Sequence, residues 1–390
     1  MPTFTIEIRT HGGAVEETIT NPTGLSWKYQ IGALGPGTIE FSVAESDTVV
    51  LGLDGTTTMP YKRDFLLKAD GVPLMGGFLS SVNMPLSGDE VHFSGVDWSK
   101  WLDQSWRYYY TPPMDYFDDV DAIIALDDST ELEVFFDPTL ATVTDWVDNI
   151  LAPISEDAGE QVILSPSYSG GVWAELLGGR IARSPNLTVK QLLDALASMG
   201  DPYGFDYWVD FDKVLNLAGP RRTDPGGIFP IATFTRTSGE IIDGDWTNNG
   251  PLGTDILFLD GQGNASRYYR KQHAASVAEF RRWGADTTIE GGDTDHLTFG
   301  TGTELEFKAA ASSYRMMFPQ RELTLQVKPE FFTFSNRLLE AIAVNYSKFP
   351  GSFRTIDASF WITSQTYSEN SPGSGDWVCD LTLDQIYSPI

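Results

Sequence analysis

The residues that most often perform hydrolytic or metal chemistry are few and scattered in this 390-residue chain. Its four histidines, His11, His92, His273 and His296, lie in different segments and form no H-E-x-x-H pair, which argues against a zinc hydrolase. No G-x-S-x-G elbow with a plausible partner histidine is present, which argues against a serine hydrolase. Cys379 is the only cysteine, so an intrachain disulfide or a multi-cysteine zinc site is impossible. In a strand-like segment such a thiol is usually a small buried apolar group.

Carboxylates are abundant, with 54 Asp and Glu residues against 26 Lys and Arg. Because two carboxylates suffice for glycoside hydrolysis, a carbohydrate-binding or glycan-depolymerising β protein is one interpretation. Abundance alone does not identify a pair, however, since some carboxylates will lie at catalytic distance by chance. No local motif distinguishes Asp206, Asp210 or Glu290 from the other acidic residues. We therefore predict no catalytic residues and no cofactor.

The segment from Trp101 to Glu160 carries 15 Asp and Glu residues and a single basic residue, Arg107. Its cluster of Asp115, Asp118, Asp119 and Asp121 invites a calcium interpretation, because hard cations bind several oxygen ligands. The cluster lacks the glycine and the distal glutamate of an EF-hand loop, so a solvated acidic face is the favoured interpretation and no metal site is predicted. The segment is too rich in aromatic and apolar residues to be disordered, and we expect it to fold onto its neighbours. Thr144 is the expected N-cap of a short helix within it.

One neighbourhood is basic in a chain whose formal net charge is -28. Its members are Arg267, Arg270, Lys271, Arg281 and Arg282. Phosphate binding needs clustered cations, and the strongly acidic whole argues against nucleic-acid binding. We expect these side chains to pair with carboxylates of the same chain or of a neighbouring subunit. The nearby G-x-G of residues 261–263 has no βαβ context, so it predicts a hairpin turn.

The stretch from Leu187 to Pro220 predicts a helix followed by a β-hairpin. Thr188 and Gln191 form a T-x-x-Q capping box, and Leu192, Leu193, Leu196 and Met199 follow at helical spacing. Gly200 and the following Asp-Pro end the helix. After it, Phe205, Tyr207 and Val209 alternate with polar residues, residues 211–213 make a turn, and Val214, Leu215 and Leu217 form the returning strand. We expect Tyr207, Trp208 and Phe211 to pack between domains.

Alternating apolar residues on both sides of this unit predict strands. Before it, the alternation covers Phe4 to Ile8, Leu25 to Ile31 and Ile39 to Val43, and Asp70-Gly71 predicts a tight turn between two further strands. After it, we expect strands within residues 228–259, 323–327, 331–334, 359–365 and 376–383, turns at residues 243–245 and 248–250, and a helix from Glu304 to Met317. The fold class is therefore mainly β with a few helices (α+β), with two β-barrel-like domains joined by a helix-hairpin unit.

The expected domain boundaries follow these changes of pattern. They are an N-terminal β-barrel in residues 1–100, an acidic insertion with a short helix in 101–186, the helix-hairpin joint in 187–225, and a second β-barrel domain with a helical insertion in 226–390. The chain begins directly with alternating residues, so we expect no signal peptide, and no apolar run approaches the length of a spanning helix.

Several short patterns, taken in order, resemble those of phage tail hub proteins. The helix "LLDAL" with the hairpin "YWVDFDKVLNL" resembles their central module, and "TIEFSVAES", "FLLKADGVPLMGGFLSSV" and "FSGVDWSKWL" resemble their first barrel. Residues 276–284 resemble an "S-I-x-x-(Y/F)-G" element, with a longer spacer before the glycine. The closing pair of strands, residues 359–365 and 376–383, resembles the end of the second barrel.

This resemblance implies a structural tail-tip protein, also called a baseplate hub or minor tail protein. It implies a ring, a trimer in related hubs, that closes the tail tube and contacts the distal tail protein, the tape-measure protein and tail fibre or receptor-binding proteins. The implied location is the virion tail tip, after assembly in the host cytoplasm. The charge of -28 fits a passage for DNA whose acidic walls do not adhere to it.

Overall fold

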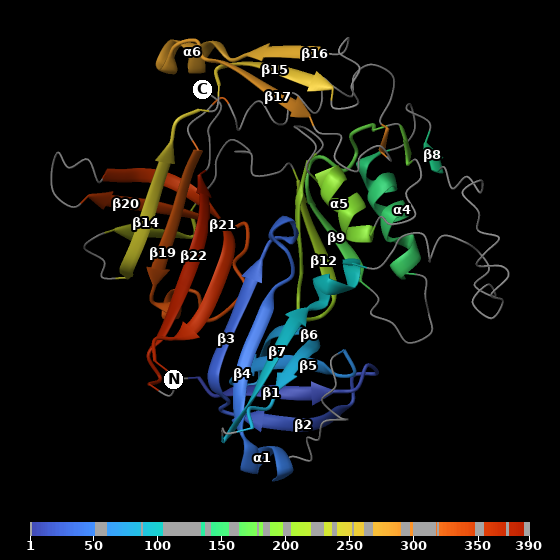
Figure 1. Ribbon diagram of the computed structural model, residues 1–390, viewed down its shortest axis with the longest axis vertical. Helices are drawn as coiled ribbons and strands as arrows, with labels where there is room; N and C mark the ends of the chain where they lie inside the picture. The colour runs from blue at the N-terminus through green and yellow to red at the C-terminus, as the bar shows by residue number, and fades with distance from the viewer. Residues whose placement is uncertain are drawn as a thin grey trace.

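The structure is a computed structural model in which strands dominate (Figure 1). It describes residues 2–50, 61–86, 89–103, 134–136, 142–155, 164–177, 179–181, 188–197, 204–219, 230–235, 240–251, 253–260, 268–289, 297–298, 317, 320–347, 355–371 and 374–385. The predicted fold class, mainly β with few helices, is confirmed. Among the described residues, no helix combines the length and apolar character needed to span a membrane.

The N-terminal part contains seven strands, one short α-helix and two 3-10 turns. They are β1 (Phe4–Arg9), β2 (Val15–Thr20), β3 (Thr23–Gln30), η1 (Gly32–Leu34), β4 (Thr38–Ala44), α1 (Glu45–Val50), β5 (Asp64–Ala69), β6 (Val72–Asn83), β7 (Glu90–Asp97) and η2 (Trp98–Asp103). The predicted alternation is confirmed, because Phe4, Ile6 and Ile8 are buried. Asp70 and Gly71 both have positive φ, 49° and 82°, as the expected primed turn requires.

In the middle of the chain, the described residues include two helices and five short strands. They are β8 (Val134–Phe136), α4 (Val143–Ser155), β9 (Ser165–Gly170), β10 (Gly179–Ile181), α5 (Val189–Ala197), β11 (Asp206–Val209) and β12 (Val214–Gly219). The capping box of α5 is confirmed: the Thr188 amide donates to Gln191 Oε1 over 2.8 Å, and the Gln191 amide donates to Thr188 Oγ1 over 3.2 Å. The predicted helix stop at Gly200 lies outside the described residues.

The predicted N-cap of α4 is wrong by two residues. The helix begins at Val143, and Thr142 caps it, because the amide of Asp145 donates to Thr142 Oγ1 over 3.2 Å while Asp145 Oδ2 accepts from the Thr142 amide over 2.7 Å. Thr144 instead donates its hydroxyl to the carbonyl of Trp173. Two threonines in a T-V-T sequence offered alternative caps, and the reciprocal contact with Asp145 is available only to Thr142.

The C-terminal part adds the remaining elements. They are β13 (Ala232–Thr235), β14 (Ile241–Asn249), β15 (Asp255–Asp260), β16 (Tyr268–Gln272), α6 (Ala274–Phe280), β17 (Gly284–Ile289), β18 (Leu297–Thr298), β19 (Gln320–Val327), η5 (Pro329–Phe331), β20 (Ala341–Ser347), β21 (Thr355–Glu369) and β22 (Trp377–Gln385). The last strands fall where the alternation predicts them. Of the helix expected over 304–317, only Met317 is described.

Two local predictions in this part are wrong. Residues 331–334 form no strand, because Pro329 begins a 3-10 turn and Thr333 and Phe334 have positive φ values of 49° and 60°. Residues 243–245 form no turn but lie inside β14, where the register shifts between Ile241 and Asp243. The irregularity therefore falls at Ile242, and Asp243, Gly244 and Asp245 pair in regular register with β19.

In the described residues, thirteen strands join in one sheet that includes both ends of the chain. Its main path runs β14-β19-β22-β21-β3-β4-β7-β6-β5-β1-β2, and β20 with β13 branches from β21. The link is the antiparallel pairing of β21 with β3, which places Gln365 opposite Tyr29 and Tyr367 opposite Trp27. Figure 1 shows β21 and β22 beside β3 and β4. The predicted domain boundaries stay a prediction. Buried apolar residues of the N-terminal and C-terminal strands belong to one hydrophobic core.

A second core lies under the helix-hairpin unit, which we define as α5, β11 and β12. Helices α4 and α5 lie side by side against the three-stranded sheet β11-β12-β9 (Figure 1). Strand β9 pairs in parallel with β12, a contact that alternation alone did not predict. Trp146 of α4 and Leu193 of α5 are both fully buried. Part of the acidic segment therefore packs with the helix-hairpin unit.

The capping box of α5 gives a first prediction. Replacing Thr188 with Ala removes the acceptor for the Gln191 amide, and we expect the free energy of unfolding to fall by about 1 kcal/mol in urea titration. Thr188→Ser keeps a hydroxyl and should retain most of the wild-type stability. Equal stability of the Ala and Ser variants would contradict the assignment.

Candidate functional site: the junction and the polar face of the sheet

The β11–β12 hairpin packs against the N-terminal strands. The ring of Tyr207 lies so close to Gly32 that a Cβ atom there would overlap it, and the Tyr207 hydroxyl donates to Asp194 Oδ1 of α5 over 2.6 Å. The indole of Trp98 donates to the carbonyl of Phe211 over 2.9 Å, and Lys213 Nζ lies 4.8 Å from the centre of the Trp98 ring. Tyr207 thus packs against the N-terminal part, and Trp208 is half-buried against the core that both chain ends share. The Phe211 side chain is exposed, and only its carbonyl makes the contact.

Asp210 connects the same hairpin to the C-terminal part. Its carboxylate accepts hydrogen bonds from Trp208 Nε1 over 3.2 Å, from Asn216 Nδ2 over 2.7 Å and from Asn336 Nδ2 over 3.1 Å. Burial raises the pKa of Asp210 above its usual range, while these amide donors act in the opposite direction. A residue that sequence alone left unremarkable is therefore a link between the hairpin and the segment before β20.

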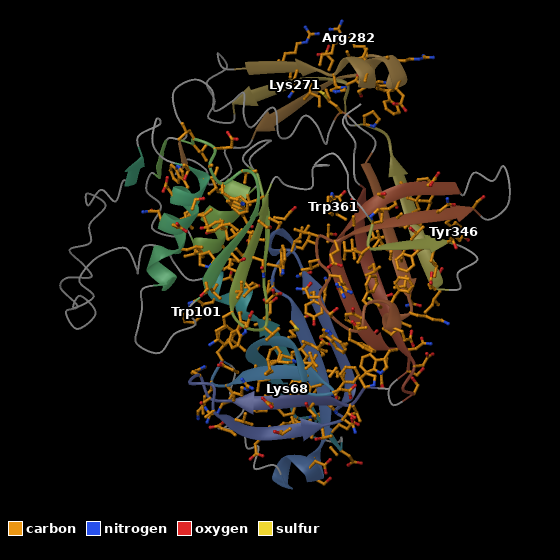
Figure 2. All side chains as sticks on the ribbon, turned by 180° about the vertical axis from the view of Figure 1, so that it is seen from behind. Lys68, Trp101, Lys271, Arg282, Tyr346 and Trp361 are labelled. Carbon is orange, nitrogen blue, oxygen red and sulfur yellow. The ribbon has the colours of Figure 1, made fainter. Side chains whose placement is uncertain are left out.

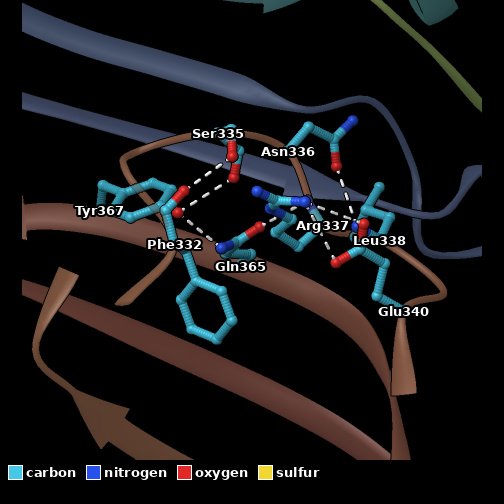
Figure 3. A network of polar contacts seen from close by, with 8 residues as sticks. All are labelled: Phe332, Ser335, Asn336, Arg337, Leu338, Glu340, Gln365 and Tyr367. Atoms are coloured by element: carbon cyan, nitrogen blue, oxygen red, sulfur yellow. Dashed lines mark hydrogen bonds and ion pairs between the residues drawn. The ribbon is translucent and has the colours of Figure 1, made fainter. Parts of the chain in front are cut away.

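The segment from Phe332 to Glu340 is in turn fixed to β21 by a buried polar network (Figure 3). Tyr367 donates its hydroxyl to the carbonyl of Ser335 over 3.0 Å and accepts from Gln365 Nε2 over 2.6 Å. Gln365 Oε1 accepts from the amide of Arg337 over 3.0 Å. Both Gln365 and Tyr367 are fully buried, so each unsatisfied polar atom would be costly.

Tyr367 also connects this network to β3, the strand paired with β21. The ring of Tyr367 stacks on that of Trp27, with centroids 5.0 Å apart and an interplanar angle of 26°. Tyr29 on the same strand donates its hydroxyl to the carbonyl of Leu74 over 3.1 Å. We call the contacts of Tyr207, Asp210, Asn336 and Tyr367 with their partners the junction. They connect the helix-hairpin unit to both ends of the chain.

Asp97 is a buried carboxylate whose charge interacts with that of Asp210 in the junction. It accepts from the Gly37 amide over 2.8 Å, from the Ser99 amide over 3.0 Å and from the Ser99 hydroxyl. Burial raises its pKa to about 7, and the negative charge of Asp210 acts in the same direction. The carboxyl therefore binds a proton more tightly in the folded chain than in the unfolded chain.

The strands on either side of the junction expose a polar surface, because every second side chain of each strand points away from the core. We call this surface the polar face. Its residues are Asp243, Asp245 and Thr247 on β14, Glu322, Thr324 and Gln326 on β19, Asp380, Thr382 and Asp384 on β22, Thr366 and Ser368 on β21, and Ser26, Lys28 and Gln30 on β3.

The register aligns the polar face into rows that cross the sheet. One row runs Asp243, Gln326, Asp380, Thr366 and Lys28, each directly opposite the next. Gln326 Nε2 donates to Asp380 Oδ1 over 3.0 Å. Among the described side chains, the part of this face on β14, β19 and β22 carries five carboxylates and no Lys or Arg. The remaining residues are short hydroxyl or amide side chains, which leaves an acidic surface without cationic attachment points.

The residues considered for catalysis do not converge in the described part of the chain. His11 Nδ1 lies 2.9 Å from Asp64 Oδ1, and His273 caps α6 by accepting from the Ser276 amide. His92 Nδ1 lies 2.6 Å from Ser42 Oγ across neighbouring strands, and the described residues supply no carboxylate bonded to this histidine. His296, Glu290 and the cluster Asp115 to Asp121 lie outside the described residues, as does Arg267. Within the described residues, no group of three or more potential metal ligands occurs.

Cys379 is buried, and two residues of the basic neighbourhood pair with a carboxylate. Cys379 is buried in β22, and burial raises the pKa of its thiol to about 12. Arg270 and Arg282 both donate to the carboxylate of Asp255, each through Nε over 2.7 Å. They hold the pKa of Asp255 well below its usual range. The expected pairing of these cations with carboxylates of the same chain is confirmed for Arg270 and Arg282.

The Asp210–Asn336 contact gives a second prediction. Asn336→Ala removes this hydrogen bond and also the one from the Leu338 amide to Asn336 Oδ1, so we expect a loss of about 2 kcal/mol in the free energy of unfolding. Asn345→Ala, at an exposed position with a 3.5 Å contact to Asp357, is the matched control and should change stability by less than about 0.5 kcal/mol. Similar losses for the two variants would show that the junction contact is not stabilising.

Asp97 gives a third prediction, on pH. Because its folded pKa is raised from 3.8 to about 7, stability from this group is greatest at low pH and declines as pH rises between these values, by up to about 4 kcal/mol. Urea titrations from pH 4 to 8 should show this slope in the wild type and a shallower slope in Asp97→Asn. Repulsion among the other carboxylates remains in both proteins, so identical slopes would refute the assignment.

No protein-family model and no curated protein sequence matches this chain. Solved structures do match it over nearly its whole length. A tail protein from Neisseria meningitidis MC58 superposes with a TM-score of 0.61 at 16% identity, covering 98% of this chain and 96% of that one. The 43 kDa tail protein of prophage MuSo2 from Shewanella oneidensis gives 0.61 at 11% identity with 100% coverage of both chains.

A prophage tail protein, gp18 from Listeria monocytogenes EGD-e, gives a TM-score of 0.54 at 10% identity, covering 97% of this chain and 94% of that one. At these identities the likeness concerns the fold, and it extends across both ends of the chain and the helix-hairpin unit between them. The resemblance to the tail hub family is confirmed at this level: the chain has the fold of phage tail proteins.

Proposed function

We propose that this chain is a structural protein of a phage tail tip, a baseplate hub that forms a homotrimeric ring and closes the tail tube. The observation that carries the proposal is the match of the whole chain, end to end, to tail proteins from three bacterial sources. Because the likeness extends over the full length of the chain, it supports a structural role for the whole chain. In this proposal the role is mechanical rather than enzymatic.

The junction supports this role because a ring component must transmit load between its parts. The hairpin contacts the N-terminal strands through Tyr207 and Phe211 and the C-terminal segment through Asp210. The two ends of the chain also share one hydrogen-bonded sheet. Relative motion of the parts would break buried polar contacts, so each subunit should behave as one stiff unit.

The polar face supports the proposed passage of DNA. A wall that DNA must pass without adhering should repel phosphates and offer few cations. The β14, β19 and β22 part of the polar face has this character, with Asp243, Asp245, Glu322, Asp380 and Asp384. We therefore assign the polar face to the lumen of the ring.

The proposed partners follow from the position of a hub. They are the distal tail protein, the tape-measure protein and tail fibre or receptor-binding proteins, all in the virion tail tip after assembly in the host cytoplasm. No observation on the described residues favours the carbohydrate-binding alternative, which would need an exposed aromatic groove beside a carboxylate pair.

The proposal predicts a defined oligomer. Light scattering coupled to size-exclusion chromatography should give three times the chain mass of 43.1 kDa at micromolar concentration. Leu193→Asp places a charge in the core of the helix-hairpin unit, where Leu193 is fully buried, and should abolish the trimer by unfolding that unit. Leu34→Asp, at an exposed position, is the matched control. A wild-type chain that stays monomeric at every concentration would overturn the proposed ring.

A further inference from the structure

The small sheet β16-β15-β17 with α6 lies at one extremity of the molecule (Figure 1) and carries an exposed aromatic residue among arginines. Trp283 is 61% exposed, the largest apolar side chain among the described exposed ones. Arg281 and Arg282 precede it, and both are exposed. Figure 2 shows Arg282 at the outer edge of this sheet. We call Arg270, Arg281, Arg282 and Trp283 the arginine corner.

The backbone of the arginine corner is held rigidly. Thr254, which is fully buried, accepts the Trp283 amide at its hydroxyl over 2.8 Å and donates that hydroxyl to the carbonyl of Arg281 over 2.7 Å. The amides of Thr254 and Asp255 both donate to the Trp283 carbonyl over 3.0 Å. The indole is fixed as well, because its Nε1 donates to the carbonyl of Phe280 over 2.7 Å. An exposed aromatic side chain held in this way is preorganised for binding.

Arg281 itself has an unusual backbone conformation. Its φ of 66° and ψ of 177° lie in a region that is essentially restricted to glycine. Glycine would relieve this strain, yet the chain has an arginine here, with its side chain exposed. Residues retained in such conformations occur most often at functional positions.

The charge of the corner favours an acidic partner. Arg270 and Arg282 share the single carboxylate of Asp255, with side chains 52% and 61% exposed, so their guanidinium groups retain donors that face solvent. Arg281, whose side chain is also exposed, adds a third guanidinium group to the corner. In a chain with net charge -28, an acidic partner is supplied by a second copy of the chain.

We propose that the arginine corner is a subunit contact, in which Trp283 and the exposed guanidinium groups dock on carboxylates of a second copy of this chain. The carboxylates that the corner meets lie outside the polar face, so the corner and its counterpart are different patches and the contact is heterologous. A heterologous contact generates a ring when its rotation closes. This inference rests on the proposed ring and identifies residues that hold it together. Its attraction is electrostatic and should weaken in high salt.

The test measures self-association of the full chain by sedimentation velocity across a concentration series. Trp283→Ala should weaken association at least about tenfold, as removal of an aromatic anchor does. Arg281→Gly should weaken it comparably while raising the melting temperature of the subunit, because glycine relieves the strain at φ 66°. A purely structural role of Arg281 would not explain weaker association together with a higher melting temperature.

Lys328→Ala is the matched control, since it removes an exposed cation elsewhere and should leave association unchanged. Wild-type association should also weaken at about 1 M NaCl. If the wild type forms a trimer that both Trp283→Ala and Arg281→Gly leave intact, the contact is overturned while the ring stands. If the variants lose binding only to a different tail protein, a second copy is excluded as the occupant. A monomeric wild type overturns both the contact and the ring.

Discussion

The pairing of β21 with β3 is the constraint on which the rest of this structure depends. It places Tyr367 opposite Trp27 and Gln365 opposite Tyr29, and so closes the two ends of the chain into one sheet. Aromatic packing stabilises the seam, because Phe4 and Phe334 also lie against the ring of Trp27, with centroids 5.4 and 6.0 Å away. Without this pairing, neither the shared core nor the continuous polar face would exist.

Local chemistry predicted much of the fold. The capping box of Thr188 and Gln191, the primed turn at Asp70-Gly71 and the alternation of the end strands depend on residues near one another in sequence, and each was found as expected. The pairing of β21 with β3 joins residues more than three hundred positions apart, and the parallel contact of β9 with β12 joins strands on either side of α5 in the sequence. No local pattern encodes such contacts, since register is set by tertiary packing.

The candidate site was harder to predict from the sequence, because its contacts also join residues that are far apart in the chain. Asp210 has no motif around it, and it becomes a link only because Asn336 is brought to it from 126 positions away. The polar face likewise arises from five strands, β3, β14, β19, β21 and β22, and its charge pattern becomes visible only once their register is known. Composition did indicate the acidic character. The signal that could have identified the arginine corner is the sequence R-R-W-G itself, a tryptophan beside two cations in a strongly acidic chain.

We propose that subunits of this fold form a ring whose lumen is lined by the polar face. Electron cryo-microscopy of the purified wild-type oligomer tests it most directly, because the strands β14, β19 and β22 can be located relative to the symmetry axis. We expect three subunits, with the carboxylates of Asp243, Asp245, Glu322, Asp380 and Asp384 directed toward a central channel. A ring in which this face points outward, or is buried between subunits, would contradict it.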